Sequence, residues 1–136
     1  MQLSNRKPLC DLLSGGRVML ESKTGCCMGK IVYFGQIGKL KNDKIAEYED
    51  LHKNCWPNIR QLIKDCNIQN YSIFRYDNMV FTYFEYTGED YEADMARMAA
   101  DEENKRWWAI TDPCFERFVY GDEEFCADMK QIFYNN

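Results

Sequence analysis

The chain has 136 residues, which suits one domain around a single hydrophobic core, and 46% of them are hydrophobic. The aromatic share of 15% is far from the composition of disordered chains and suggests a stacking or sugar-facing pocket besides a core. With 22 acidic and 17 basic side chains the net charge is −5, which repels a phosphate backbone and argues against nucleic acid as a partner.

The cysteine pattern argues against both a zinc site and a disulfide framework. Seven cysteines, an odd number, occur with no C-x-x-C pair, and the chain has one histidine. We read no secretory leader and no apolar run long enough to cross a membrane. We therefore expect a cytoplasmic protein with reduced thiols.

The N-terminal stretch differs from the rest of the chain. Residues 1–29 contain four glycines and keep neither a two-residue nor a 3.6-residue hydrophobic period. We expect a mobile extension there, followed by one folded domain over residues 30–136. Residues 30–37, KIVYFGQI, have the β-branched and aromatic content of a buried strand that opens this domain.

Residues 42–66 carry the single histidine, His52, with Tyr48 four residues before it and Trp56 four residues after it. At 3.6 residues per turn these side chains stack on one side of a helix, and that side is also the apolar one. His52 is therefore expected to point inward. Pro57 lacks an N–H and disfavours helical geometry in the residue before it, so we expect a kink or a second helix there.

The start of this helix and the strands that follow it have recognisable signals. Asn42 or Asp43 is the expected N-cap. Two aromatic, alternating runs, residues 70–76 and 79–86, flank Asp77-Asn78 and predict a β-hairpin, since both turn residues tolerate positive φ. Alternation places Tyr71 on one face of its strand with Ile73 and Arg75.

The remaining residues predict two more helices and a last strand. Residues 89–110 read as two helices that meet near Asp101, and residues 111–122 as a loop with a turn of helix around 115–118. Residues 129–134, MKQIFY, are the expected closing strand.

The order β, α, β, β, α, β predicts an α+β, ferredoxin-like βαββαβ fold, a four-stranded antiparallel sheet with the helices on one face. The other face carries aromatic side chains that need burial. We expect a homodimer that closes through these sheet faces into a dimeric α/β barrel.

Four stretches resemble the L-rhamnose mutarotase family: EYEDLHKNCWP at 47–57, NYSIF at 70–74, RWW at 106–108 with TD at 111–112, and QIFY at 131–134. The resemblance covers residues 30–134. It implies a small dimeric enzyme that interconverts the anomers of a deoxy-sugar. Residues 121–128 depart from the family's usual approach to the last strand, which leaves the sugar open between L-rhamnose and a relative such as L-fucose.

The resemblance also implies the roles of five residues. His52 would be the proton donor, Tyr48 and Tyr71 would contact the sugar, and Trp107 and Trp108 would form part of its binding wall. Exchange of anomers needs a proton delivered to the ring oxygen as one leaves the anomeric hydroxyl, and histidine has the pKa nearest neutrality. Such an acid contributes roughly 10² to 10⁴ in rate, with no metal or cofactor required.

Plainer readings stand beside these roles. His52 could be a core imidazole bonded to a backbone carbonyl, and Tyr48 and Trp56 could be packing residues. Adjacent tryptophans on a helix diverge by about 100°, so one of Trp107 and Trp108 is expected in the core. The rival functions are a cofactor-independent monooxygenase and a non-catalytic sugar-binding module on the same fold.

Overall fold

The computed structural model describes residues 30–117 and 125–136, so the predicted extension over residues 1–29 lies outside the described residues. The helices and strands, in chain order, are β1 (Val32–Lys39), η2 (Asn42–Lys44), α1 (Ile45–Lys53), α2 (Pro57–Asp65), β2 (Ile68–Tyr76), β3 (Met79–Tyr86), α3 (Tyr91–Ala100), α4 (Glu102–Thr111), η3 (Asp112–Cys114) and β4 (Cys126–Met129).

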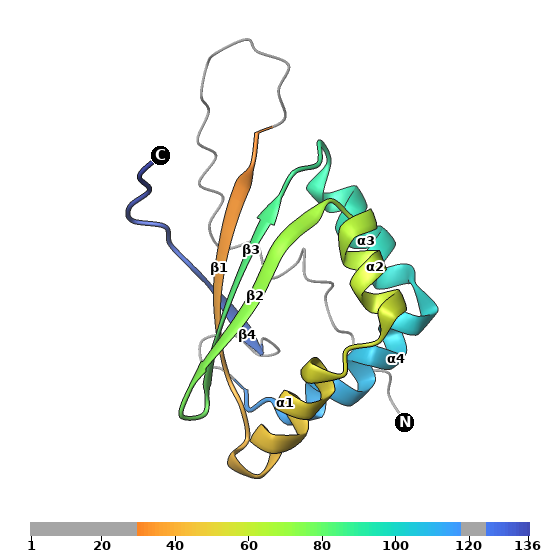
Figure 1. The fold of residues 1–136 in the computed structure, drawn as a ribbon, viewed down its shortest axis with the longest axis vertical. Coiled ribbons are helices and arrows are strands. Elements are labelled where there is room, and N and C mark those ends of the chain that lie inside the picture. The colour runs from red at the N-terminus through yellow and green to blue at the C-terminus, as the bar shows by residue number, and fades with distance from the viewer. Residues whose placement is uncertain (1–29, 118–124) are drawn as a thin grey trace.

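The four strands form one antiparallel sheet in the order β2-β3-β1-β4. In the described part of the chain, all four α-helices lie on one side of this sheet and the other side carries no helix (Figure 1). The predicted α+β, ferredoxin-like fold is therefore confirmed. Across residues 30–117 and 125–136, no helix is both long and apolar enough to cross a lipid bilayer.

The break at Pro57 takes the form of a second helix. α1 ends at Lys53, and α2 begins with Pro57 at its first position, after Trp56 adopts extended geometry with φ −60° and ψ 133°. The expected N-cap is wrong, because a 3-10 turn over Asn42–Lys44 precedes α1 and neither start has a side-chain cap hydrogen bond.

The hairpin is confirmed, with a two-residue loop between the paired residues Tyr76 and Met79 and with Asp77 at a φ of 52°. A β-bulge between Gln69 and Ser72 was not predicted. Asn70 adopts a φ of 51° within it, a conformation that asparagine tolerates better than most residues.

The two C-terminal helices meet at Asp101, as predicted. The Asp101 carboxylate accepts a hydrogen bond from the backbone N–H of Asn104 at 2.8 Å and so caps α4.

The predicted last strand is wrong in its position. β4 comprises Cys126–Met129 and pairs with Gly35 to Gly38 of β1, while residues 130–136 have no regular secondary structure. The β-branched and aromatic run at 131–134 looked strand-like, but strand propensity depends on a surface to pack on. Ile132 and Phe133 have none here and are 90% and 79% exposed.

The helical turn expected around residues 115–118 is instead the 3-10 helix η3 at Asp112–Cys114. Phe115 follows it in extended geometry and forms an antiparallel bridge with Leu40. The backbone N–H of Lys41 donates to the Cys114 carbonyl at 2.8 Å, which fixes this segment beside the end of β1.

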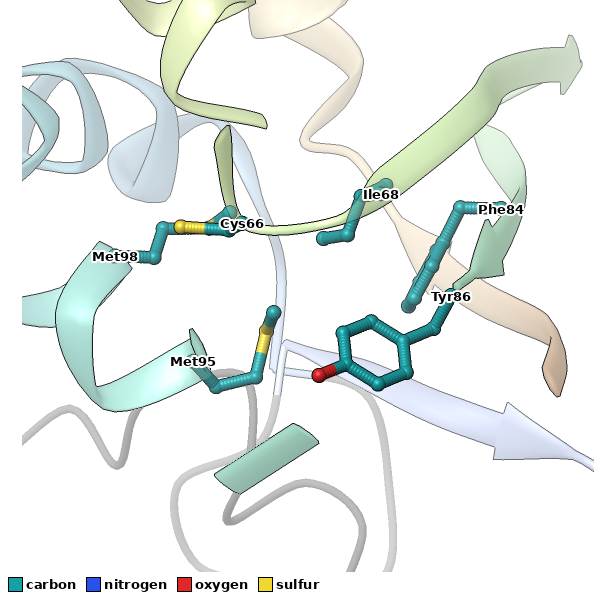
Figure 2. Packing of buried hydrophobic residues seen from close by; sticks show 6 residues of the cluster. All are labelled: Cys66, Ile68, Phe84, Tyr86, Met95 and Met98. Carbon is teal, nitrogen blue, oxygen red and sulfur yellow. The ribbon is translucent and has the colours of Figure 1, made fainter. Parts of the chain in front are cut away.

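Two groups of buried residues fill the space between sheet and helices. The Met cluster, shown in Figure 2, consists of Cys66, Ile68, Phe84, Tyr86, Met95 and Met98. The Tyr48 cluster consists of Leu40, Tyr48, Val80, Cys114 and Phe115. The second cluster anchors α1 on the sheet and thereby sets the position of His52.

Candidate functional site

His52 lies in the last turn of α1, half-buried, with its Nδ1 atom 2.9 Å from the backbone carbonyl oxygen of Tyr48. A carbonyl oxygen only accepts, so Nδ1 carries a hydrogen and donates it. The neutral ring then has its lone pair on Nε2. This contact is the backbone bond that the plainer interpretation of His52 expected, and it also fixes the orientation of the ring.

Aromatic rings lie on both sides of His52. The Tyr48 ring centroid is 4.2 Å from the imidazole centroid at an interplanar angle of 40°, and the Trp107 centroid is 5.4 Å away at 72°. Tyr48 and Trp107 are only 6% and 5% exposed. The helical spacing thus brings Tyr48 and His52 together, as predicted, and α4 adds the indole.

Two further rings support this group. Trp56 meets Trp107 edge to face at 5.3 Å, and Phe115 meets Tyr48 edge to face at the same distance. The spacing of Trp56 from His52 already placed it on this side of the helix. Phe115 was missed, because it lies in a stretch predicted as a loop with one turn of helix, and no periodicity marks it.

Burial lowers the pKa of His52 below its usual value of 6.5, and the hydrogen bond to the Tyr48 carbonyl offsets part of this effect. Desolvation disfavours the imidazolium, whereas an acceptor on Nδ1 favours it. The ring is therefore mostly neutral near pH 7, and its charged form is a readier proton donor than a solvated histidine.

The adjacent tryptophans of α4 have different neighbours. Trp107 contacts His52, whereas Trp108 is half-buried and packs against the Met cluster. A step of about 100° per residue along the helix accounts for the divergence. The sequence predicted this split but left open which indole lies with the histidine.

Tyr71 does not join the group around His52. It lies on the helix-covered face of β2, 39% exposed, with its ring stacked on Phe84 at 5.7 Å and 21°. The bulge after Gln69 leaves Asn70 and Tyr71 opposite Phe84, and Ile73 packs on the same side against the Tyr48 cluster. Tyr71 therefore borders the Met cluster.

In the described parts of the chain, no group of three histidine, cysteine or acidic side chains has the arrangement of a metal site.

The family model described as L-rhamnose mutarotase matches residues 33–135 of the chain. Among curated relatives, the L-rhamnose mutarotase of Formosa agariphila is 32% identical over 96 residues, which are 69% of this chain and 75% of the relative. The L-rhamnose mutarotase of Oceanobacillus iheyensis is 30% identical over 94 residues, 68% of this chain and 86% of the relative. That of Bacillus subtilis is 30% identical over 95 residues, with the same two shares.

Solved structures agree with this match. The crystal structure of an L-rhamnose mutarotase from Formosa agariphila superposes with a TM-score of 0.60 at 25% identity, covering 77% of this chain and 99% of that one. A putative antibiotic biosynthesis monooxygenase from Caulobacter crescentus gives a TM-score of 0.51 at 12% identity, covering 77% and 92%, which is a likeness of fold alone. The chain therefore belongs to the L-rhamnose mutarotase family, a family of isomerases that act on carbohydrates.

Proposed function

We propose that the protein interconverts the α and β anomers of L-rhamnose, or of a close 6-deoxy relative such as L-fucose, by acid and base assistance to ring opening. The observation that carries this proposal is the half-buried imidazole of His52, held by its Nδ1 bond to Tyr48 between the rings of Tyr48 and Trp107. The relatives named L-rhamnose mutarotase support the choice of sugar.

His52 is the proposed proton donor. Its imidazolium delivers the Nε2 proton to the ring oxygen as the bond between that oxygen and the anomeric carbon breaks, while Tyr48 or a bound water assists loss of the anomeric hydroxyl proton. The open-chain carbonyl then turns, and closure on its other face reverses both transfers. No proton is gained or lost overall, and the proposed reaction uses no cofactor.

The residues proposed to contact the sugar form two groups, one beside His52 and one beside the Met cluster. Tyr48 and Trp107 lie beside His52, and an indole face suits the apolar side of a pyranose with its methyl group. Tyr71 and Trp108 border the Met cluster, Tyr71 through its stacking on Phe84. We place the sugar between these two groups, with Tyr71 and Trp108 forming the wall that faces His52.

NMR magnetisation transfer between the anomers of L-rhamnose tests the proposal. Wild-type protein should accelerate exchange well above the spontaneous rate, and His52→Gln should remove most of that acceleration, since a general acid contributes roughly 10² to 10⁴. Exchange that His52→Gln leaves unchanged would remove His52 from the mechanism. Parallel measurements with L-fucose and L-mannose show whether the 6-deoxy carbon is selected.

Two rival functions have distinct outcomes. A cofactor-independent monooxygenase would consume oxygen with quinols, and a sugar-binding module would bind L-rhamnose saturably without accelerating exchange. The likeness to a putative monooxygenase is at 12% identity and favours neither activity. The oriented imidazole favours the mutarotase, because a binding module needs no proton-transfer group.

We also propose that the protein is a homodimer closed through the helix-free face of the sheet. Large apolar residues are exposed on that face, with Phe74 at 64%, Tyr76 at 79% and Tyr83 at 37%. A contiguous exposed patch of this kind is typical of an interaction surface. A second copy of the same face would bury aromatic against aromatic around a two-fold axis.

A reducing compartment such as the cytoplasm is the proposed location. In the described part of the chain, the cysteines Cys55, Cys66, Cys114 and Cys126 are all free thiols.

A further inference from the structure

A row of polar side chains crosses the middle of the helix-covered face of the sheet. Gln36 of β1 is the register partner of both Thr82 of β3 and Asp128 of β4. Gln36 and Thr82 are buried, at 4% and 7% exposure, and the Gln36 side-chain amide donates to the Asp128 carboxylate at 2.9 Å. We call these three residues the polar row.

On one side of the polar row lies the Tyr48 cluster. Two residues further along each strand, Gly38, Val80 and Cys126 form the next row on this face. Val80 belongs to the Tyr48 cluster, and a Cβ added at Gly38 would lie 3.0 Å from the Phe115 ring. Rows on one face of a sheet are about 6 to 7 Å apart, so the polar row is one step from this cluster.

On the other side of the polar row lies the Met cluster. Phe34 and Phe84 are register partners in the preceding row and stack at 4.7 Å, and Tyr71 stacks on Phe84. The proposed sugar contacts of α1 and of β2 thus stand on opposite sides of the polar row.

Burying the Gln36 amide and the Thr82 hydroxyl has a desolvation cost that aliphatic side chains would not have, whereas the Asp128 carboxylate beside them is exposed. A buried amide or hydroxyl destabilises the fold relative to an aliphatic side chain unless it is well hydrogen-bonded. Sugar sites, in contrast, need a few polar groups set in an aromatic and apolar lining. An amide can donate to and accept from sugar hydroxyls, and a carboxylate accepts from them.

We propose that the polar row is the hydroxyl-recognising floor of the sugar site, with Asp128 accepting hydrogen bonds from ring hydroxyls and Gln36 holding its carboxylate in place. The inference rests on the proposed function. It adds Gln36, Thr82 and Asp128 to the residues that choose the sugar, while proton transfer stays with His52. It also places the pyranose over the centre of the sheet, between Tyr71 and Tyr48.

The test uses Thr82→Val and Asp128→Asn, two changes that keep the side-chain shape. Binding is measured by NMR titration with methyl α-L-rhamnopyranoside, whose blocked anomeric carbon prevents exchange, and KM and kcat are measured with L-rhamnose. Thr82→Val should weaken binding and raise KM by about three- to tenfold, and Asp128→Asn by about tenfold or more. The value of kcat should change by less than about threefold, because neither residue transfers the proton.

The matched control is Glu85→Gln. Glu85 is also a strand carboxylate that accepts from a neighbouring strand's glutamine, Gln69 at 2.7 Å, but on the helix-free face. Its KM and its binding of the glycoside should equal those of wild type. A KM unchanged in Thr82→Val and Asp128→Asn together with a lowered urea midpoint would overturn the proposal and make the row purely structural.

Failure of the proposed function can be distinguished from failure of the polar-row proposal. If wild type binds the glycoside but does not accelerate exchange, only the proposed mutarotase activity is overturned. Weaker binding by the two variants would still support sugar recognition by the polar row. If wild type neither binds the glycoside nor accelerates exchange, both proposals are overturned.

Discussion

The Nδ1 atom of His52 donates a hydrogen bond to the carbonyl oxygen of Tyr48, one helical turn earlier in α1. Since that oxygen only accepts, Nδ1 keeps its hydrogen in both charge states of the ring. The hydrogen that is gained and lost during titration is therefore on Nε2. Any proton that His52 exchanges with a substrate passes through this one atom.

The rate of catalysed anomer exchange should fall as pH rises through a midpoint below 6.5. Burial lowers the pKa of His52, so the imidazolium, which is the proposed donor to the ring oxygen, becomes scarce before neutral pH is reached. Measuring kcat/KM by NMR between about pH 5 and 8 follows the free enzyme's titration. If the rate instead rises through the same midpoint and then stays level, the neutral ring is the active form. His52 would then act first as a base, and Nε2 would accept the proton of the anomeric hydroxyl.

The same pKa shift links His52 to stability. Because the folded-state pKa lies below the unfolded value, the unfolded chain binds more protons as pH falls below 6.5, and the free energy of unfolding decreases there. Well above 6.5, from about pH 7.5, His52 is neutral in both states and this contribution is constant. In urea titrations, His52→Gln should lose less stability than wild type between neutral pH and about pH 5. Parallel loss in both proteins would contradict the shift.

Substitutions of the two tryptophans of α4 should differ in their effect on kcat/KM. Trp107→Phe removes ring area beside His52 and should lower kcat/KM by about tenfold, a loss typical of one aromatic contact. Trp108→Phe alters packing against the Met cluster and should affect kcat/KM less. Each should lower the free energy of unfolding by about 1 to 3 kcal/mol, measured with urea. Equal kinetic effects would show that both indoles bear on the sugar to the same degree.

Local chemistry made much of α1 and α2 predictable from sequence. The four-residue spacing of Tyr48 and His52 fixes a shared helix side whatever the rest of the chain does, and the missing N–H of Pro57 ends the first helix. The choice between Trp107 and Trp108 was out of reach, because it depends on how α4 turns toward its neighbours. Helix periodicity says that adjacent residues diverge, not which one meets a distant histidine.

The register of the sheet was the second feature that could not be predicted from the sequence. Tyr71 lies opposite Phe84 because a bulge after Gln69 inserts a residue, and nothing in the strand's alternation marks that insertion. The polar row could not be predicted from the sequence either, because Gln36, Thr82 and Asp128 come together only through the pairing of three strands far apart in the chain.

If the homodimer forms as proposed, one charged side chain on the helix-free face of the sheet should separate the two chains. Phe74→Lys places an ammonium in the proposed contact and should shift the molecular mass measured by light scattering from two chains to one. Ile110→Lys is the matched control, an apolar residue 36% exposed on α4, and should leave the mass unchanged. A wild-type mass of one chain, or a Phe74→Lys protein that keeps two chains, would rule out this face as the dimer contact.

Gly88, between β3 and α3, should tolerate no side chain. A Cβ built there would overlap the hydroxyl of Tyr86 and lie 2.8 Å from Oδ2 of Asp94, and that hydroxyl donates to the same Oδ2 at 2.5 Å. Gly88→Ala must disturb this part-buried hydrogen bond and the Tyr86 ring, which packs into the Met cluster, so it should lower the free energy of unfolding by about 1 to 3 kcal/mol. In Gly35→Ala the new Cβ would come closest to the flexible end of Met129, at 3.3 Å, so the urea midpoint of this variant should fall less. Equal midpoints for the two variants would mean that the chain at Gly88 can move aside without breaking the contact between Tyr86 and Asp94.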